Sequence, residues 1–251
     1  MQTILSEDET LEDLQLNGLR LIQNKNAFRF GMDAVILADF AVIRSTDTVA
    51  DLGTGNGILP LLLFGRNKGT RFYAVELLPA AADYARRNVR LNGLEDRITV
   101  LTADAGDAAD YIQPCSVDAV ICNPPYGHHD ASLSSPNEGK ATARNQAIDT
   151  LNRFFSGAFS ILKGKGKLFL VYPAAQMLYV MKKLQDHHLE PKRFRLVYPY
   201  LSRPANLVLI EAVKDAKPTL HPMPPMIIYH EDGALTKELK SVYHMKEQTE
   251  F

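Results

Sequence analysis

From residue 46 onward, short apolar segments alternate with longer amphipathic ones, and this alternation restricts the possible folds more than any other feature of the chain. Apolar segments at 47–53, 71–77, 98–104, 117–123 and 167–173 predict buried strands. Strand–helix units repeated in this way specify a parallel sheet that helices cover on both faces. We therefore expect an α/β fold built on an open, mostly parallel sheet.

The end of this region breaks the alternation. Segments 194–200 and 206–214 both predict strands, and no helical segment separates them. Two strands without a crossover helix between them pair antiparallel. The expected sheet therefore has seven strands, the last of them antiparallel.

The same pattern predicts the other segments. Residues 127–144 are polar and contain glycine, serine and proline, so we expect a loop there. We expect helices at 58–66, 79–93, 145–166 and 174–188.

Upstream of the sheet, residues 17–40 predict two short strands joined around Asn24–Asn26, followed by a helix from Asp33. An ordinary hairpin and helix covering a sheet edge is the alternative interpretation of this segment. We expect effectively one domain, divided as an N-terminal extension (1–45), a core (46–214) and a C-terminal tail packed on the core (215–251).

Open parallel sheets bind ligands beyond the carboxyl ends of their strands, and the first predicted strand ends in Asp-Leu-Gly-Thr-Gly-Asn-Gly. Glycines at this point let the backbone approach a nucleotide-like ligand and turn directly into a helix. A tight turn without a ligand is the alternative. The candidate binding residues here are Asp51, Gly53, Gly55 and Gly57.

Acidic residues close the next two strands. Glu76 lies 25 residues after Asp51, where a carboxylate can accept hydrogen bonds from both ribose hydroxyls. Asp104 can accept from an exocyclic amine of adenine, or it can cap the following helix. A solvated strand end is the alternative for Glu76.

The fourth strand ends in Asn123-Pro124-Pro125-Tyr126, and with this motif the sequence resembles class I S-adenosylmethionine-dependent methyltransferases that methylate amino groups. Enzymes of that kind carry Asp/Asn-Pro-Pro-Tyr/Phe after the fourth strand. The resemblance implies a Rossmann-like methyltransferase core. It also implies S-adenosylmethionine as cofactor, with S-adenosylhomocysteine as product.

The chemistry of this motif suits a planar amine, which is a poor nucleophile because its lone pair is delocalised. The Asn123 side-chain oxygen and the Pro124 carbonyl can both accept from the NH2 group and direct its electron density toward the methyl donor. The prolines fix φ and remove competing N–H donors. Tyr126 can stack on a planar target. We therefore predict that Asn123, Pro124, Pro125 and Tyr126 are catalytic, and that Asn123 also lies at the cofactor.

The upstream segment narrows the resemblance. Phe28-Arg29-Phe30-Gly31-Met32-Asp33 is similar to a segment that closes over the cofactor in the bacterial tRNA1(Val) adenosine-37 N6-methyltransferase family. The resemblance implies cofactor contacts from Phe30, Gly31 and Asp33, and it continues to Arg203-Pro204-Ala205 and beyond. Core packing is the alternative for Phe28 and Phe30.

The implied activity is N6-methylation of an adenosine in tRNA, with position 37 of the anticodon loop as the expected site. Guanine N2 in ribosomal RNA, adenine N6 in DNA and protein glutamine are alternative acceptors for the same motif. A non-catalytic module that binds cofactor and RNA is the alternative from a different class. The motif does not specify the tRNA, the residues that contact RNA or the oligomeric state.

Composition and residue spacing indicate neither a membrane-spanning segment nor a metal site. No apolar run reaches the roughly 18 residues that span a bilayer, and we expect a cytoplasmic protein. Cys115 and Cys122 lack metal-type spacing and are expected to be buried free thiols, and adjacent His128 and His129 rarely chelate one ion. The net charge is −1. The clusters of lysine and arginine in the chain have two interpretations. They are either solvated ends of helices and strands or a face that contacts phosphates of the nucleic acid. We expect no obligate protein partner.

Overall fold

A computed structural model of the protein describes residues 5–25, 31–126 and 138–244. The strands are β1 (Glu9–Asp13), β2 (Arg20–Asn24), β3 (Thr48–Leu52), β4 (Arg71–Glu76), β5 (Ile98–Thr102), β6 (Val117–Cys122), β7 (Leu162–Pro173), β8 (Leu189–Tyr198), β9 (Leu207–Lys214), β10 (His221–Pro222) and β11 (Met226–Ile227). The α-helices are α1 (Met32–Phe40), α2 (Ile58–Gly65), α3 (Pro79–Leu91), α4 (Glu138–Ile161), α5 (Met177–Asp186) and α6 (Lys237–Val242). Two 3-10 helices, η1 (Ala105–Asp110) and η2 (Ala174–Gln176), complete the elements.

The main sheet confirms the predicted α/β architecture. Its strand order is β10-β8-β9-β7-β6-β3-β4-β5, and β11 also pairs with β8. The five strands from β7 to β5 run parallel, while β9 is antiparallel to both β7 and β8. Within the described residues the sheet has nine strands rather than seven, because two short pieces of the tail add to β8.

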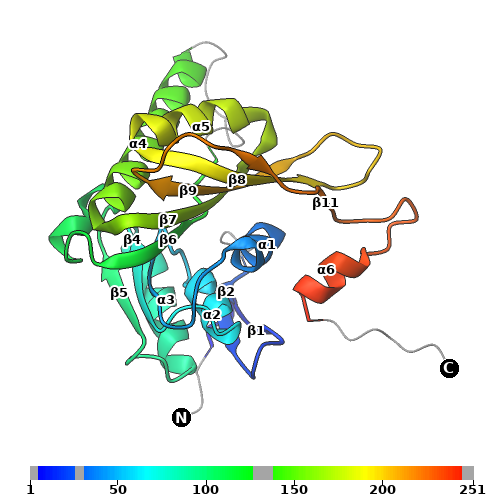
Figure 1. Cartoon of the computed structure of the whole chain (residues 1–251). Helices are drawn as coiled ribbons and strands as arrows, with labels where there is room; N and C mark the ends of the chain where they lie inside the picture. The colour runs from blue at the N-terminus through cyan, green and yellow to red at the C-terminus, as the bar shows by residue number, and fades with distance from the viewer. Residues whose placement is uncertain (1–4, 26–30, 127–137, 245–251) are drawn as a thin grey trace.

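Two hydrophobic cores cover the two faces of this sheet, as the continuous apolar strands require. Successive strand residues divide between them: Val49 of β3 packs with α1, α2 and α3, and Ala50 packs with α4 and α5. Figure 1 shows α4 and α5 on one side of the sheet and α1 with α2 on the other. The carboxyl edge between these layers is therefore positioned by both cores.

The N-terminal hairpin differs from its prediction. The pairing joins β1 to β2, with Asp13 opposite Arg20, so the turn lies at 14–19 and not around Asn24–Asn26. Asn17 and Gly18 both have positive φ, at 51° and 75°, the backbone twist that a tight hairpin turn uses. Residues 26–30, where the second strand was expected, lie outside the described residues.

Other predicted boundaries were also wrong, and β8 begins at Leu189 where a strand was expected from 194. Helix α4 begins at Glu138, within the predicted loop 127–144, while 127–137 lies outside the described residues. The same helix ends at Ile161, and the Lys-Gly-Lys-Gly segment belongs to β7. Of the two free cysteines, Cys122 is buried as predicted, but Cys115 is exposed.

The tail packs back onto the core through β10, β11 and α6. Figure 1 shows α6 lying beside α1, and Arg66 of the core donates to the Val242 carbonyl at 2.6 Å. No helix in the described part of the chain is long and apolar enough to cross a membrane.

Candidate active site

Four strand ends meet at the carboxyl edge of the sheet and carry most of the predicted site residues. Leu52 lies opposite Cys122 on one side and Val75 on the other, and Glu76 pairs with Thr102. The residues that follow these positions share one edge because parallel neighbours end together. The structure thus brings together Asp51, Glu76, Asp104 and Asn123.

The glycine loop after β3 follows a path that only glycine adopts easily. Gly53 has φ 74°, and a Cβ on it would lie 2.8 Å from the ring of Phe154. Its N–H and that of Thr54 both donate to the Val75 carbonyl at 2.9 Å, so the loop is fixed to β4. Gly55 also has a positive φ, and a Cβ there would meet no atom within 4 Å. Open space therefore lies over this part of the backbone, before Gly57 begins α2.

Asp51 is a fully buried carboxylate of the site whose charged form is disfavoured. Its side chain is 1% exposed, and one oxygen accepts from the Thr54 hydroxyl at 2.5 Å. The other oxygen, Oδ1, is buried with no hydrogen-bond partner among the described residues. Burial, together with the nearby charge of Glu76, raises the pKa of Asp51 to about 7. A buried acceptor without a partner at a strand end is the condition that a cationic ligand relieves.

Glu76 is held in one orientation by backbone donors. Its Oε2 accepts from the Gly55 N–H at 2.8 Å and its Oε1 accepts from the Leu78 N–H at 2.9 Å. Each carboxylate oxygen can accept a second bond, so the group can still receive two hydroxyl donors. The residue is 8% exposed, which makes this a nearly buried carboxylate at the rim of the glycine loop.

Asp104 takes the capping role that was its alternative prediction. Its Oδ1 accepts from the Gly106 N–H at 2.7 Å at the start of η1 and from Arg153 Nε at 2.6 Å. The Arg153 side chain comes from α4, whose contribution the sequence did not predict. Contact between Asp104 and an adenine ring stays a prediction.

In the Asn-Pro-Pro-Tyr motif that follows β6, the Tyr126 hydroxyl is hydrogen-bonded within the site. The Tyr126 hydroxyl lies 2.8 Å from Asn123 Oδ1 and 3.2 Å from Asp33 Oδ2. Its single hydrogen has two acceptors within reach, of which the Asn123 oxygen is nearer. Burial and the neighbouring Asp33 raise the pKa of Tyr126, so the hydroxyl remains a donor. The Tyr126 ring packs edge-on against Tyr172 with centroids 5.5 Å apart, and its stacking on a target base stays a prediction.

The segment predicted to cover the cofactor is described only from Gly31 onward. Gly31 precedes α1 in extended conformation, and a Cβ on it would lie 2.8 Å from Asp33 Oδ1. Asp33 thus reaches the catalytic motif through Tyr126, a contact that the sequence did not predict. Phe28, Phe30, Gly127, His128 and His129 lie outside the described residues.

In the motif itself, Pro124 is buried and Pro125 is exposed. No group of three His, Cys, Asp or Glu side chains suited to a metal gathers in the described ranges. The absence of a metal requirement stays a prediction.

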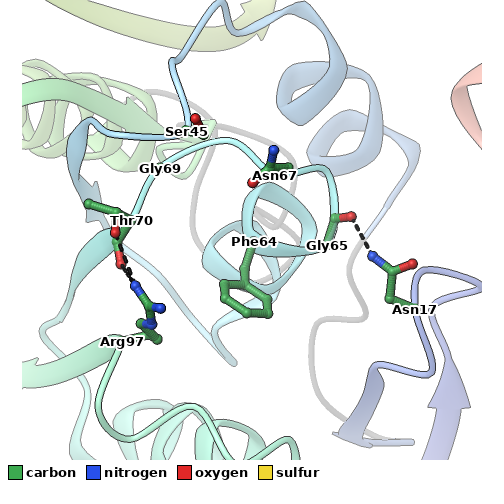
Figure 2. Close-up of a pocket in the computed structure, with 8 residues that line it drawn as sticks. All are labelled: Asn17, Ser45, Phe64, Gly65, Asn67, Gly69, Thr70 and Arg97. Atoms are coloured by element: carbon green, nitrogen blue, oxygen red, sulfur yellow. Dashed lines mark hydrogen bonds between the residues drawn. The ribbon is translucent and has the colours of Figure 1, made fainter.

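A separate pocket of about 460 Å³ lies at the amino ends of the strands, away from the carboxyl edge (Figure 2). Thr70 and Arg97 line it just before β4 and β5 begin, and Arg97 donates to the Thr70 hydroxyl at 3.0 Å. None of the predicted site residues that the structure describes lines this pocket.

Comparison with known proteins agrees with this geometry. Residues 32–190 match the family described as "Methyltransferase small domain". A tRNA1(Val) (adenine(37)-N6)-methyltransferase of Bacteroides thetaiotaomicron is 30% identical over 171 residues, which cover 68% of this chain and 70% of the relative. The protein of the same name from Actinobacillus succinogenes is 29% identical over 215 residues, covering 84% and 87%.

Solved structures agree in fold. A predicted O-methyltransferase, protein Atu636 from Agrobacterium tumefaciens, matches with a TM-score of 0.68 and 22% identity over 85% of this chain and 96% of that one. TYW2 of Pyrococcus horikoshii, in complex with MeSAdo, matches with a TM-score of 0.57 and 18% identity over 84% and 73%.

Proposed function

The chain belongs to the methyltransferase small domain family and, within it, to the family of the tRNA1(Val) (adenine(37)-N6)-methyltransferases, and we propose that it methylates N6 of adenosine 37 in tRNA1(Val). It is an S-adenosylmethionine-dependent methyltransferase. The observation that carries the proposal is the Asn123 side-chain oxygen, held in place by Tyr126 beside the glycine loop.

The residues of the carboxyl edge fit the cofactor. When bound, S-adenosylmethionine supplies an electrophilic methyl group on a cationic sulfur. The unpartnered Oδ1 of Asp51 would stabilise positive charge there, and Glu76 would accept from the ribose hydroxyls. The open backbone at Gly55 leaves room for the ligand to lie directly on the loop.

The catalytic motif would bind and orient the amine. Asn123 Oδ1 keeps a second lone pair after accepting from Tyr126, and this lone pair would receive one N6–H. The Pro124 carbonyl would receive the other. Two acceptors on one NH2 group direct its remaining electron density away from them and toward the methyl group. Since N6 can lose its proton to water after the new bond has formed, no side-chain base is required.

The RNA substrate is proposed from the names of the relatives and from the position of Asn123 at the site. An adenine must leave its stack to present N6 to Asn123, and a base in a loop unstacks more easily than one in a duplex. From the proposed tRNA substrate we infer a cytoplasmic enzyme.

Substitution at Asn123 tests this proposal. Asn123→Ala removes the acceptor and is expected to lower kcat at least about 100-fold, the usual cost of losing a preorganised polar group at a reacting centre. Asn123→Asp is the matched control. It keeps an acceptor oxygen at the same place, and we expect it to retain far more activity than the alanine variant.

The assay is transfer of labelled methyl groups to total tRNA, ribosomal RNA, DNA and a protein extract, followed by analysis of the labelled product. Cofactor affinity, measured by calorimetry, should stay within about threefold of wild type in both variants. Full activity of Asn123→Ala would refute the catalytic role. Label confined to guanosine, DNA or glutamine would refute the substrate.

A further inference from the structure

The β1–β2 hairpin is joined to α3 by asparagine side chains that take the place of a neighbouring strand. The Asn88 amide accepts from the Ile22 N–H at 2.6 Å and donates to the Ile22 carbonyl at 2.9 Å. One helical turn further on, Asn92 does the same with Arg20, at 2.9 and 2.8 Å. Alternate strand residues present both backbone groups to one side, and helix positions four apart share a face. The two amides therefore match the edge of β2.

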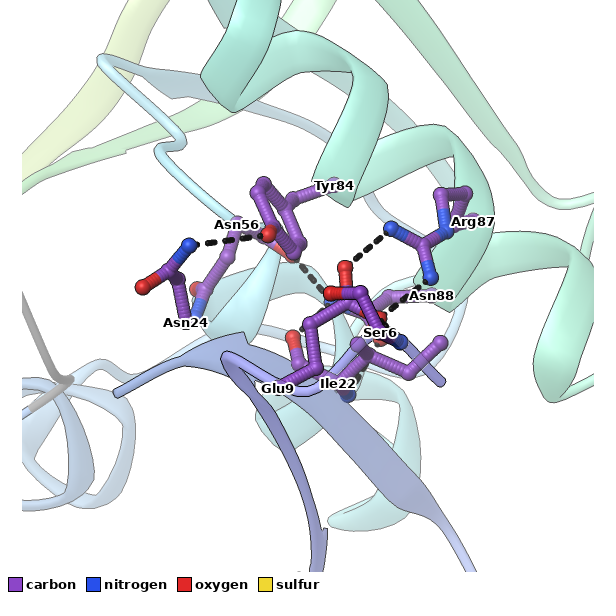
Figure 3. Close-up of polar contacts among 8 residues, drawn as sticks. All are labelled: Ser6, Glu9, Ile22, Asn24, Asn56, Tyr84, Arg87 and Asn88. Carbon is purple, nitrogen blue, oxygen red and sulfur yellow. Dashed lines mark hydrogen bonds and ion pairs between the residues drawn. The ribbon is translucent and has the colours of Figure 1, made fainter. Parts of the chain in front are cut away.

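Only one of the two amides also reaches the glycine loop. Asn88 Nδ2 donates a second hydrogen bond, of 2.9 Å, to the Asn56 carbonyl (Figure 3). Asn56 stands between Gly55, whose N–H is held by Glu76, and Gly57, the N-cap of α2. Asn92 instead donates its second bond to the Asn88 carbonyl, within α3.

Burial makes this link a firm one. The Asn88 side chain is 0% exposed and makes three hydrogen bonds, one of which is the contact with the loop. Losing a buried amide leaves the Ile22 N–H and the carbonyls of Ile22 and Asn56 without that partner, and such groups are costly to leave unpaired. A shift of the loop would strain the hydrogen bond between the Asn88 side chain and the Asn56 carbonyl.

A second contact holds the hairpin on the same face of α3. Arg87 forms a two-bond ion pair with Glu9 of β1, at 2.5 and 2.8 Å, and its guanidinium lies 5.3 Å from the centre of the Tyr84 ring. The hairpin is thus fixed to α3 independently of Asn88. Removing Asn88 alone should therefore free the Asn56 carbonyl of the loop, while the other bonds of the loop and the docked hairpin remain.

We propose that Asn88 is a positioning residue for the cofactor loop, which it fixes to the N-terminal hairpin through the Asn56 carbonyl. It does not touch the reacting atoms. It holds the backbone between Gly55 and Gly57 in the conformation that receives S-adenosylmethionine. The proposal rests on the proposed function, in which this loop binds S-adenosylmethionine. It adds a residue that contacts the loop from its far side.

Paired variants test the proposal, because Asn92 offers a matched control. Asn88→Ala and Asn92→Ala each remove a two-bond contact with β2, so both are expected to lower thermal stability. Only Asn88→Ala removes the bond to the loop. We expect calorimetry to show that Asn88→Ala weakens S-adenosylmethionine binding about tenfold more than Asn92→Ala does.

Equal loss of affinity in the two alanine variants, or no loss in either, would overturn the proposal and leave Asn88 as a contact for the fold alone. If Asn88→Ala does not fold, Asn88→Ser carries the same comparison, since its smaller polar side chain leaves room for water at the Ile22 backbone. The readout is cofactor binding without RNA. If the enzyme methylates a substrate other than tRNA, the affinities of these variants for S-adenosylmethionine would not change. Such an error would be seen only when the methylated product is analysed.

Discussion

The buried carboxylate of Asp51 makes the stability of the ligand-free protein depend on pH in an unusual direction. An unfolded aspartate loses its proton near pH 4, but burial raises the pKa of Asp51 in the folded protein to about 7. Between these values the folded state binds one more proton than the unfolded state. The free energy of unfolding therefore falls as pH rises through this range, the reverse of the usual behaviour of a paired carboxylate.

The size of the effect follows from the difference between the two pKa values. Each pKa unit corresponds to about 1.4 kcal/mol, and most of the change falls between pH 5 and pH 8, where it amounts to about 2–3 kcal/mol. For a chain of this length, this corresponds to a decrease in Tm of roughly 5–10 °C. Asp51→Asn removes the titration and keeps an acceptor for the Thr54 hydroxyl. Its stability should therefore lack this component of the pH dependence.

Urea unfolding at pH 5, 6, 7 and 8, on wild type and Asp51→Asn, isolates the contribution of Asp51, because other titrating groups contribute equally to both. Thr54→Val is the companion variant. It deletes the hydrogen bond that favours the charged form, so the fall in stability should move to higher pH. Parallel curves for wild type and Asp51→Asn would refute the reasoning.

Asp51 also connects stability to ligand binding. If its Oδ1 faces the cationic cofactor, as proposed, affinity should rise from pH 6 to pH 8 as the carboxylate forms, and Asp51→Asn should lose that rise. We therefore expect Asp51→Asn to be more stable than wild type at pH 8 and to bind the cofactor more weakly. This combination is typical of a binding site that destabilises the protein in the absence of its ligand.

Three further variants test other contacts. Tyr126→Phe removes the hydroxyl that orients Asn123 and should lower kcat about tenfold, with cofactor affinity nearly unchanged in calorimetry; an unaltered kcat would contradict this. Glu9→Gln should lower the free energy of unfolding by about 1–2 kcal/mol at pH 7, measured by urea unfolding. The loss is moderate because Arg87 is partly exposed and water screens the ion pair. Arg87 holds the pKa of Glu9 at about 2, so the wild-type advantage should be complete above pH 4.5 and vanish as pH falls toward 2; a constant advantage would contradict this. Gly157→Ala would place a Cβ 1.8 Å from the Ala105 carbonyl oxygen and should cost at least about 3 kcal/mol in the same assay, whereas Gly164→Ala, which meets no atom within 4 Å, should be tolerated.

The sequence predicted the sheet and the strand-end residues because both follow from local pattern. Apolar strands mark the parallel layer, and polar residues at their carboxyl ends meet wherever such strands lie side by side. Asp51, Glu76, Asp104 and Asn123 needed no knowledge of distant contacts.

The errors came from signals that were missed or were absent from the local pattern. Asn17-Gly18 is a strong hairpin signal, and it would have placed the turn correctly. The polar start of α4 lacks an apolar stripe, so its composition resembles that of a loop. Cys115 is exposed because its turn carries it out of the core, with φ 54°.

Contacts between distant segments could not be predicted at all. Asn88 meets β2 across 66 residues, and Tyr126 meets Asp33 across 93. A single asparagine in a helix gives no local sign that it will join a hairpin to a cofactor loop. Only the folded chain brings these partners together.

The most direct measurement of the central claim uses an unmodified tRNA1(Val) transcript, S-adenosylmethionine and the wild-type enzyme, with mass spectrometry of the digested product. We predict one N6-methyladenosine per transcript, located at position 37, and none in a transcript with guanosine at that position. Methylation at another position, or no methylation by an enzyme that binds S-adenosylmethionine normally, would contradict the account.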